Sequence, residues 1–243
     1  MRAHFEQFYI APEQVGVTDF YLKGEEFTHA VRVLRKKPGD VLQAVDGRGH
    51  LFEGIVVAIQ KQQIIVRIER RFHRLGEPRI RLVLAFAVPK TAQSDWVIEK
   101  GTEIGVTTFQ PILTERTIPD PSSRVDRWRH KALAAMKQCG RSVLPDVREP
   151  LHFAAALAVH GHMPGFLAHD HNSPTDQNDF ERLRQCEEAV VYIGPEGGFN
   201  KPEASLALAS GVIPLSLGPR RLRSETAALV AITKILHYAG ELD

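Results

Sequence analysis

The chain has 243 residues, a formal net charge of +2 and a hydrophobic fraction of 43%. This length suffices for one large domain or two smaller ones, and the composition is that of a globular protein with a substantial core. No apolar stretch is long enough to cross a bilayer, the first ten residues lack the apolar segment of a secretory signal, and two isolated cysteines exclude a disulfide framework. We therefore expect a cytoplasmic protein without a membrane partner.

Residues 1–72 are predicted to form a domain rich in β-strands. Short runs of β-branched and aromatic residues occur at 7–11, 41–45, 51–59 and 63–71. The turn-forming segments KKPGD and DGRGH flank the second run. This spacing is typical of a small β-barrel, a fold that often carries RNA-binding surfaces. Residues 73–78 are predicted to be a linker.

A basic segment lies within this first domain. Residues 27–39 contain no acid, and RVLRKK places four cations in six residues. The net charge of the whole chain does not indicate a nucleic-acid partner, but a local basic cluster can bind a phosphate backbone on a near-neutral protein. The candidate RNA contacts in this segment are Arg32, Arg35, Lys36 and Lys37. The alternative is a solvated charged turn.

From residue 79 onward, predicted strands alternate with predicted helices. Strands are expected at 79–88, 106–112, 165–170, 188–194 and 212–218, and helices at 91–105, 124–140, 179–187, 201–210 and 224–240. In the last helix we expect Ser224 at the N-cap, Glu225 in the first turn and Gly240 at the C-terminal stop. The alternation predicts an α/β domain with a mostly parallel sheet over residues 79–243.

Two Gly-Pro turns follow successive strands of this predicted domain. They are IGPEGGFN, residues 193–200, and LGPRRLRSETAA, residues 217–228. Neither matches a dinucleotide fingerprint or a P-loop, and Glu196 would repel a phosphate but suit a cation or a hydrogen-bond donor. One interpretation is an ordinary tight turn between strand and helix. Because ligands bind at the carboxyl ends of strands in open α/β sheets, we predict a ligand site between the two turns.

Together the two turns resemble those of the knotted SPOUT-class RNA methyltransferases. The resemblance is closest to the bacterial enzymes that methylate N3 of a uridine in 16S ribosomal RNA. HAVRVLRKKPGD (29–40), EKGTEIGV (99–106) and KQCGRSVLPDV (137–147) are similar to further motifs of that family, in the same order. The resemblance implies a PUA-like barrel followed by an α/β domain with a C-terminal trefoil knot. It also implies S-adenosylmethionine (SAM) as methyl donor, a homodimer, the small ribosomal subunit as partner and no metal.

The resemblance further implies which residues form the site. Glycines let the backbone approach the cofactor closely, and leucines supply apolar walls. The expected cofactor contacts are Leu167, His169, Ile193, Gly194, Gly197, Leu217, Gly218, Leu222, Thr226 and Ala227. Arg220 and Arg221, in a second basic cluster, and Arg141 join the RNA-binding candidates; for Arg141, closure of the dimer is the alternative role.

Methylation at N3 sets the chemistry expected of the remaining residues. Uracil N3 keeps its proton at neutral pH, so the enzyme must accept that proton and stabilise the anion beside the two carbonyl oxygens. N3 also lies on the pairing edge, so the base must be unpaired or flipped out. We predict Arg223 as anion stabiliser and phosphate clamp, and Glu225 as general base with Glu196 as the alternative. Glu225 could instead be an acid that stabilises the helix N-terminus, and Arg223 a member of an ion pair.

Two other functions are compatible with the sequence. One is a non-catalytic RNA-binding or ribosome-assembly factor, and the other is a knotted methyltransferase that acts on another RNA position. The glycines at 194, 197 and 218 favour an enzyme, because a protein that only binds RNA has no need of a cofactor crevice. The N-terminal motif favours the ribosomal target.

Overall fold

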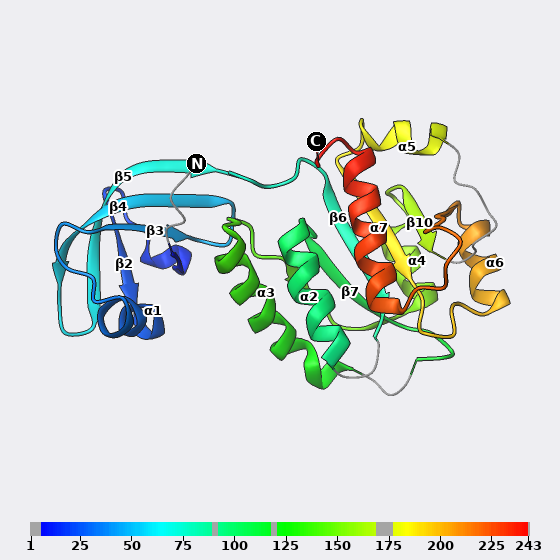
Figure 1. Ribbon diagram of the computed structural model, residues 1–243, viewed down its shortest axis with the longest axis horizontal. Coiled ribbons are helices and arrows are strands. Elements are labelled where there is room, and N and C mark those ends of the chain that lie inside the picture. Colours follow the sequence, from blue (N-terminus) through cyan, green and yellow to red (C-terminus); the bar gives the residue numbers. More distant parts are fainter. Residues whose placement is uncertain (1–5, 89–91, 118–120, 169–176, 243) are drawn as a thin grey trace. The chain divides into compact units, whose positions relative to one another are not determined.

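The chain divides into two compact units. The computed structural model (Figure 1) describes residues 6–88, 92–117, 121–168 and 177–242. The first unit consists of residues 1–77 and 136–144, and the second of residues 78–135 and 145–243. The first unit therefore includes most of the predicted linker. It also takes a segment, 136–144, that the prediction assigned to the second domain.

The first unit is built on a five-stranded sheet with the strand order β1-β3-β4-β5-β2. Alternate residues of all five strands, such as Phe8, Phe20 and Val66, face a single core. The strands are β1 (Gln7–Tyr9), β2 (Asp19–Lys23), β3 (Val41–Val45), β4 (His50–Ile59) and β5 (Gln63–His73), and the short helices are η1 (Pro12–Gln14), α1 (Gly24–Thr28) and the π-helix η2 (His29–Val33). The predicted β-rich domain is confirmed, although β2 was not among the predicted strands.

Segment 136–144 joins the first unit through a buried ion pair. The guanidinium Nη2 of Arg141 lies 2.8 Å from Oε2 of Glu77, whose side chain is 0% exposed. The other carboxylate oxygen of Glu77 accepts hydrogen bonds from the backbone N–H groups of Ser142 (2.7 Å) and Val143 (2.9 Å). Gln7 donates from Nε2 to the Arg141 carbonyl oxygen at 2.7 Å. Since this network occupies a buried guanidinium, we leave Arg141 out of the proposed RNA surface.

The second unit contains a parallel sheet with the strand order β12-β10-β11-β6-β7-β8, and β9 also pairs with β7. Its strands are β6 (Arg81–Ala87), β7 (Thr108–Leu113), β8 (Asp146–Val147), β9 (Leu151–His152), β10 (Gly165–Ala168), β11 (Glu188–Ile193) and β12 (Ile213–Pro214). Its helices are α2 (Ala92–Ile104), η3 (Ser122–Arg124), α3 (Val125–Cys139, the last turn of which belongs to the first unit), α4 (Phe153–His160), α5 (Gln177–Leu183), α6 (Lys201–Ala209) and α7 (Ser224–Tyr238). The prediction of an α/β domain with a mostly parallel sheet is confirmed.

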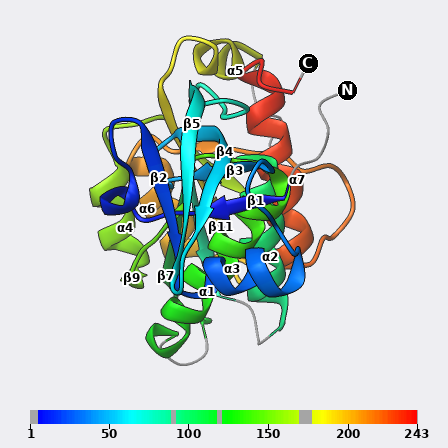
Figure 2. The ribbon, with the colours of Figure 1, turned by 90° about the vertical axis from the view of Figure 1, so that its left-hand side faces the viewer.

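Helices cover both faces of this sheet. Figures 1 and 2 show α2 and α7 on one face and α4 and α6 on the other. Residues 82–87 of β6 are all buried, whichever face they point to. This explains the nearly continuous apolar run in the sequence, which is typical of a strand covered on both sides.

The ends of α7 test the predicted caps. Arg223, not Ser224, is the N-cap, because its carbonyl oxygen accepts the first helical hydrogen bond, from Ala227 N–H at 2.8 Å. Ser224 is instead the first helical residue, and it is buried. At the other end, Gly240 has φ +76°, and its N–H and that of Glu241 bond back to the last turn of the helix. The C-terminal stop at Gly240 is therefore confirmed as a Schellman motif.

His160 places a buried imidazole at the end of helix α4. His160, the last residue of α4, is 2% exposed, and among the described residues its Nε2 has no hydrogen-bond partner. Burial, reinforced by the positive charge of Arg148, lowers the pKa of His160 from 6.5 to about 4. The unfolded imidazole therefore binds a proton at a higher pH than the folded one does. It follows that this residue costs stability as the pH falls from 6.5 to about 4.

We expect His160→Leu to weaken the acid sensitivity of folding. The wild-type chain should lose up to about 3 kcal/mol more of its unfolding free energy than the variant over that pH interval. Urea unfolding at several pH values between 7 and 4 measures the difference. His130→Gln is the control, because His130 is exposed and is not among the charged groups that act on the pKa of His160. Identical slopes for the wild type and His160→Leu would contradict the assignment.

Candidate functional site

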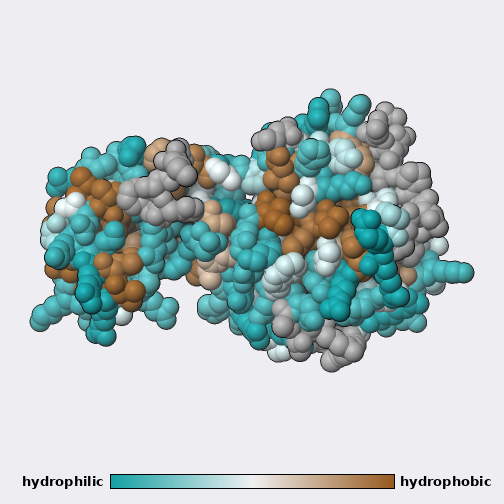
Figure 3. Space-filling view, viewed as in Figure 1, coloured by the Kyte–Doolittle hydropathy of each residue, from teal (hydrophilic) through white to brown (hydrophobic). Residues whose placement is uncertain are grey.

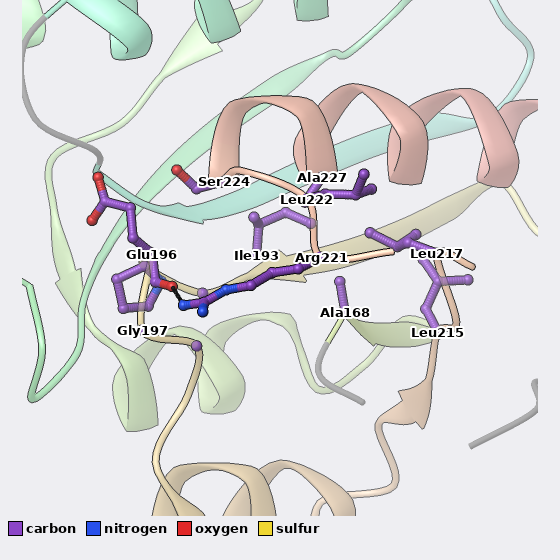
Figure 4. A pocket seen from close by; sticks show the side chains of 13 residues that line it. Ala168, Ile193, Glu196, Gly197, Leu215, Leu217, Arg221, Leu222, Ser224 and Ala227 are labelled. Atoms are coloured by element: carbon purple, nitrogen blue, oxygen red, sulfur yellow. Dashed lines mark hydrogen bonds between the residues drawn. The ribbon is translucent and has the colours of Figure 1, made fainter. Parts of the chain in front are cut away.

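A cavity of about 290 Å³ lies between the two Gly-Pro turns (Figure 4). Its walls come from the carboxyl ends of β10 and β11, the turn after β11, the loop after β12 and the first turn of α7. The lining residues are Ala168, Ile193, Gly194, Pro195, Glu196, Gly197, Gly198, Leu215, Leu217, Arg221, Leu222, Ser224 and Ala227. The structure therefore contains a cavity at the position predicted for the ligand site.

Most residues predicted from the two turns line this cavity. The predicted cofactor contacts among them are Ile193, Gly194, Gly197, Leu217, Leu222 and Ala227, together with Glu196 and Arg221. Leu167, Gly218, Thr226, Arg223 and Glu225 do not line it, and His169 lies outside the described residues. Leu167 is buried in the core, and the side chain of Thr226 is exposed on α7. Sequence reasoning missed Ala168, Leu215 and Ser224 as wall residues.

The first turn, residues 194–198, folds tightly on itself. A Cβ on Gly194 would lie 3.0 Å from the backbone nitrogen of Phe199, and Gly198 has φ +68°. The turn then ends in a capping box, in which Asn200 Oδ1 accepts from the Glu203 N–H at 2.7 Å and Glu203 Oε2 accepts from the Asn200 N–H at 2.9 Å. These constraints hold the backbone of the turn at the mouth of the cavity.

The second turn is held from two sides. The backbone N–H of Leu215 donates to the Leu167 carbonyl oxygen of β10 at 2.8 Å. Lys234 Nζ, on α7, donates to the carbonyl oxygen of Ser216 at 2.8 Å. Gly218 follows with φ +96°, a conformation that residues with a side chain rarely adopt. The predicted importance of Gly218 thus has a physical reason in the shape of the turn.

The cavity has one apolar end and one polar end. Figure 4 shows Leu215, Leu217 and Ala168 together at one end, and the Glu196 carboxylate and the Ser224 hydroxyl at the other. Arg221 extends along the cavity toward the polar end and donates from Nη2 to the Glu196 carbonyl oxygen at 3.4 Å. This arrangement suits a ligand with a flat apolar part and a cationic or hydrogen-bonding part.

The other two predicted catalytic residues begin α7. Arg223 is exposed, and it caps the helix through its backbone. Glu225 is partly buried in the first helical turn, with Oε2 3.5 Å from the Ser224 hydroxyl. Glu225 thus occupies the first-turn position at which an acid stabilises a helix N-terminus. The hydrogen bond with Ser224 links Glu225 to a residue of the cavity wall.

The basic segment of the first unit surrounds the π-helix η2. Arg32, Arg35 and Lys37 are exposed, and Lys36 donates from Nζ to the Val41 carbonyl oxygen at 3.2 Å. Arg35 has φ 53°, a rare backbone conformation for a residue with a side chain. π-Helical turns and such residues are enriched at functional sites. The second cluster also presents its arginines to solvent, since Arg220 and Arg221 are exposed.

None of the helices in the described part of the chain is long and apolar enough to cross a membrane. In the same part of the chain, no group of three or more His, Cys, Asp or Glu side chains could hold a metal ion.

Comparison with known proteins defines the class. The family model described as RNA methyltransferase domain matches residues 76–236, and the RNA methyltransferase PUA domain matches residues 22–69. The chain thus has the domains of an RNA methyltransferase with a PUA domain. The ribosomal RNA small subunit methyltransferase E of Synechocystis is 33% identical over 232 residues, 93% of this chain and 75% of the relative. The protein of that name in Buchnera aphidicola from Acyrthosiphon pisum is 28% identical over 94% of this chain and 92% of its own length.

A solved structure agrees with these relatives. The ribosomal RNA small subunit methyltransferase E of Neisseria gonorrhoeae, bound to S-adenosyl methionine, superimposes with a TM-score of 0.83 and 27% identity. The match covers 96% of this chain and 98% of that one. The chain belongs to the ribosomal RNA small subunit methyltransferase E family.

Proposed function

We propose that this protein transfers a methyl group from SAM to N3 of a uridine in 16S ribosomal RNA. The observation that carries the proposal is the cavity between the two Gly-Pro turns, in a chain whose relatives are ribosomal RNA methyltransferases. The Neisseria relative was solved with S-adenosyl methionine bound, which supports the same cofactor here. The position N3 and the class of knotted SPOUT enzymes rest on the motif resemblance.

The cavity residues fit this cofactor. Leu215, Leu217 and Ala168 form an apolar end that would take the flat adenine. Glu196 supplies a negative charge that suits a sulfonium cation and disfavours a phosphate-bearing cofactor. When bound, SAM supplies an electrophilic methyl group. The cavity volume, about 290 Å³, is close to the lower limit of ordinary small-molecule sites, roughly 300 Å³.

The chain's own groups then have separate roles in our proposal. Glu196 lines the cavity and Glu225 does not, so we place Glu196 first and Glu225 second as acceptor of the N3 proton. Arg223, exposed at the start of α7, stabilises the uracil anion as its negative charge develops. Ser224, a residue that is 6% exposed and lies on the cavity wall, orients the reacting base through its hydroxyl by hydrogen bonding.

The basic segment around η2 is proposed to bind RNA phosphates. We expect Lys36→Ala combined with Lys37→Ala, or Arg35→Ala alone, to weaken RNA binding and leave SAM binding unchanged. Each lost phosphate contact should reduce the slope of log affinity against log salt by about 0.9 on duplex RNA or about 0.7 on single strands. Filter binding of 16S ribosomal RNA at several salt concentrations measures this slope. An unchanged slope would identify the segment as a solvated turn.

A homodimer and a trefoil knot in the second unit are also part of the proposal. Support for a dimer comes from apolar side chains exposed on neighbouring helices, Trp96 on α2 (43% exposed) and Val230 on α7 (38%). Figure 3 shows apolar surface over α7 on the face seen in Figure 1. Light scattering coupled to size-exclusion chromatography tests the dimer.

Two measurements test the central proposal. Isothermal titration with SAM should show stoichiometric binding, which a non-catalytic assembly factor would lack. Mass mapping of 16S ribosomal RNA from a deletion strain should show one uridine without its methyl group, restored by complementation. A methyl group missing elsewhere would move the target to another RNA position.

A further inference from the structure

Arg116 contacts the turn formed by residues 194–198, which lines the cavity, although the sequence around Arg116 does not predict this contact. It stands after β7, 81 residues before Gly197, and donates from Nη1 to the Gly197 carbonyl oxygen. Its neighbour Glu115 is held at the same turn, because its N–H donates to Glu203 Oε1 at 2.9 Å and its carboxylate accepts from Asn200 Nδ2. The loop after β7 is therefore hydrogen-bonded to the segment that forms the mouth of the cavity.

The missing side chain of Gly197 makes room for Arg116. A Cβ at position 197 would lie 3.2 Å from Cδ and 3.4 Å from Nη1 of Arg116. Gly197 was expected to let the backbone approach the cofactor. The structure shows a second reason for a glycine here, because Arg116 occupies the space into which a side chain at position 197 would project.

A second guanidinium reaches the adjacent carbonyl group. Arg221 bonds to the carbonyl oxygen of Glu196, and Arg116 bonds to that of Gly197. Both side chains are exposed, and no described carboxylate lies within ion-pair distance of either. The two cations thus bond to the neutral carbonyl oxygens of adjacent residues, and among the described residues most of their N–H donors have no acceptor. Their mutual repulsion falls when an anion lies between them.

We propose that Arg116 and Arg221 form a clamp for one RNA phosphate at the mouth of the cavity. The inference rests on the proposed function and adds to it the site that holds the backbone of the target strand. Guanidinium groups bind phosphate through paired, charge-assisted hydrogen bonds. Arg221 lines the cavity and Arg116 does not, so the phosphate lies at the rim, where two guanidinium groups outweigh the single Glu196 carboxylate that disfavours a phosphate inside the cavity. The carboxylate of SAM is the competing anion, and the experiment separates the two.

The test compares Arg116→Gln, Arg221→Gln and the double variant. With unmethylated small subunits and with transcribed 16S ribosomal RNA as probes, we expect the double variant to lose about tenfold or more in affinity. Its salt slope should fall by about 0.7–0.9, the contribution of one phosphate. Because both groups hold the same phosphate, the double loss should be smaller than the product of the single losses. Arg182→Gln, an exposed arginine of α5 outside the cavity wall, is the charge-matched control.

SAM affinity, measured by isothermal titration, separates the clamp from other roles. Unchanged SAM affinity of Arg116→Gln, which does not change the cavity wall, with weakened RNA binding supports the clamp. Weakened SAM binding of this variant with unchanged RNA binding assigns the arginines to the cofactor carboxylate and overturns the clamp. RNA affinity equal to that of Arg182→Gln would also overturn it. If the double variant melts at a lower temperature than the wild type, Arg116→Lys takes its place in the test. This variant keeps the charge but loses the paired geometry, so it should still weaken RNA binding. Wild-type RNA affinity of Arg116→Lys would reject the clamp. A wild-type chain that does not bind SAM would refute the proposed function, while the RNA titration would still test the clamp.

Discussion

Replacing Ala227 with leucine should weaken SAM binding by about 100-fold. Ala227 lines the cavity from the first turn of α7, so three further carbon atoms would project into a space of about 290 Å³. Overpacking of a closely fitted site costs up to about 3 kcal/mol, which corresponds to this loss. Leucine is a good helix former, so α7 should keep its structure. Isothermal titration measures the affinity, and thermal melting checks the fold.

Thr233→Leu provides the matched control for this experiment. Thr233 is exposed on the same helix and does not line the cavity, so its replacement should leave SAM affinity unchanged. Equal affinities for Ala227→Leu and the wild type, with both folded, would remove the cofactor from this cavity. Gly197 is a less suitable position, because a side chain there meets Arg116 and would disturb both proposed sites.

Glu196→Gln should lower the single-turnover rate of methyl transfer by roughly 100-fold, the usual loss for a missing proton acceptor. The loss should shrink as the pH rises, since hydroxide then removes the N3 proton unaided. SAM affinity should change much less than the rate, which rapid-quench measurements with saturating cofactor would show. Glu225→Gln is the comparison. A larger loss there, with the same rescue at high pH, would give the role to Glu225.

Arg223→Ala should show a comparable defect without rescue at high pH, because the anion still lacks its cation. Near-normal rates in both glutamine variants would leave Glu225 as a helix N-terminal acid and Glu196 as a wall residue. In that case Arg223 alone would carry the proposed electrostatic contribution.

The elements predicted well from sequence are those whose local pattern matches their final environment. The apolar runs of β6 and β11 and the capped helix α7 belong to this group. Helix α4 was missed because FAAALAVH is apolar on almost every side and so shows no helical periodicity. Strand β2 was missed although its five residues all pair with β5, and β12 keeps only two residues of a longer predicted run. Their pairing partners, distant in sequence, define them.

The same distinction applies to the site. Both turns carry their signal in consecutive residues, so Ile193, Gly194, Leu217 and Ala227 could be placed from sequence. The sequence favours Ser224 as a cap, whereas the helix begins at that residue, which puts its hydroxyl on the cavity wall. Arg116 gave no signal, because its contact with Gly197 depends on the placement of β7 and β11 on either side of β6 in the sheet.

Residues 136–144 belong to the first unit, so this unit is still incomplete when the ribosome has made residues 1–77. When the ribosome has released residues 1–77, Glu77 lacks Arg141 and the N–H groups of Ser142 and Val143, and Gln7 lacks its carbonyl partner. A carboxylate that is 0% exposed in the finished protein stays hydrated until about 65 further residues emerge. The N-terminal unit is thus completed by a segment translated in the middle of the α/β unit, so we expect the first unit to reach its final packing only after residue 144 has been made.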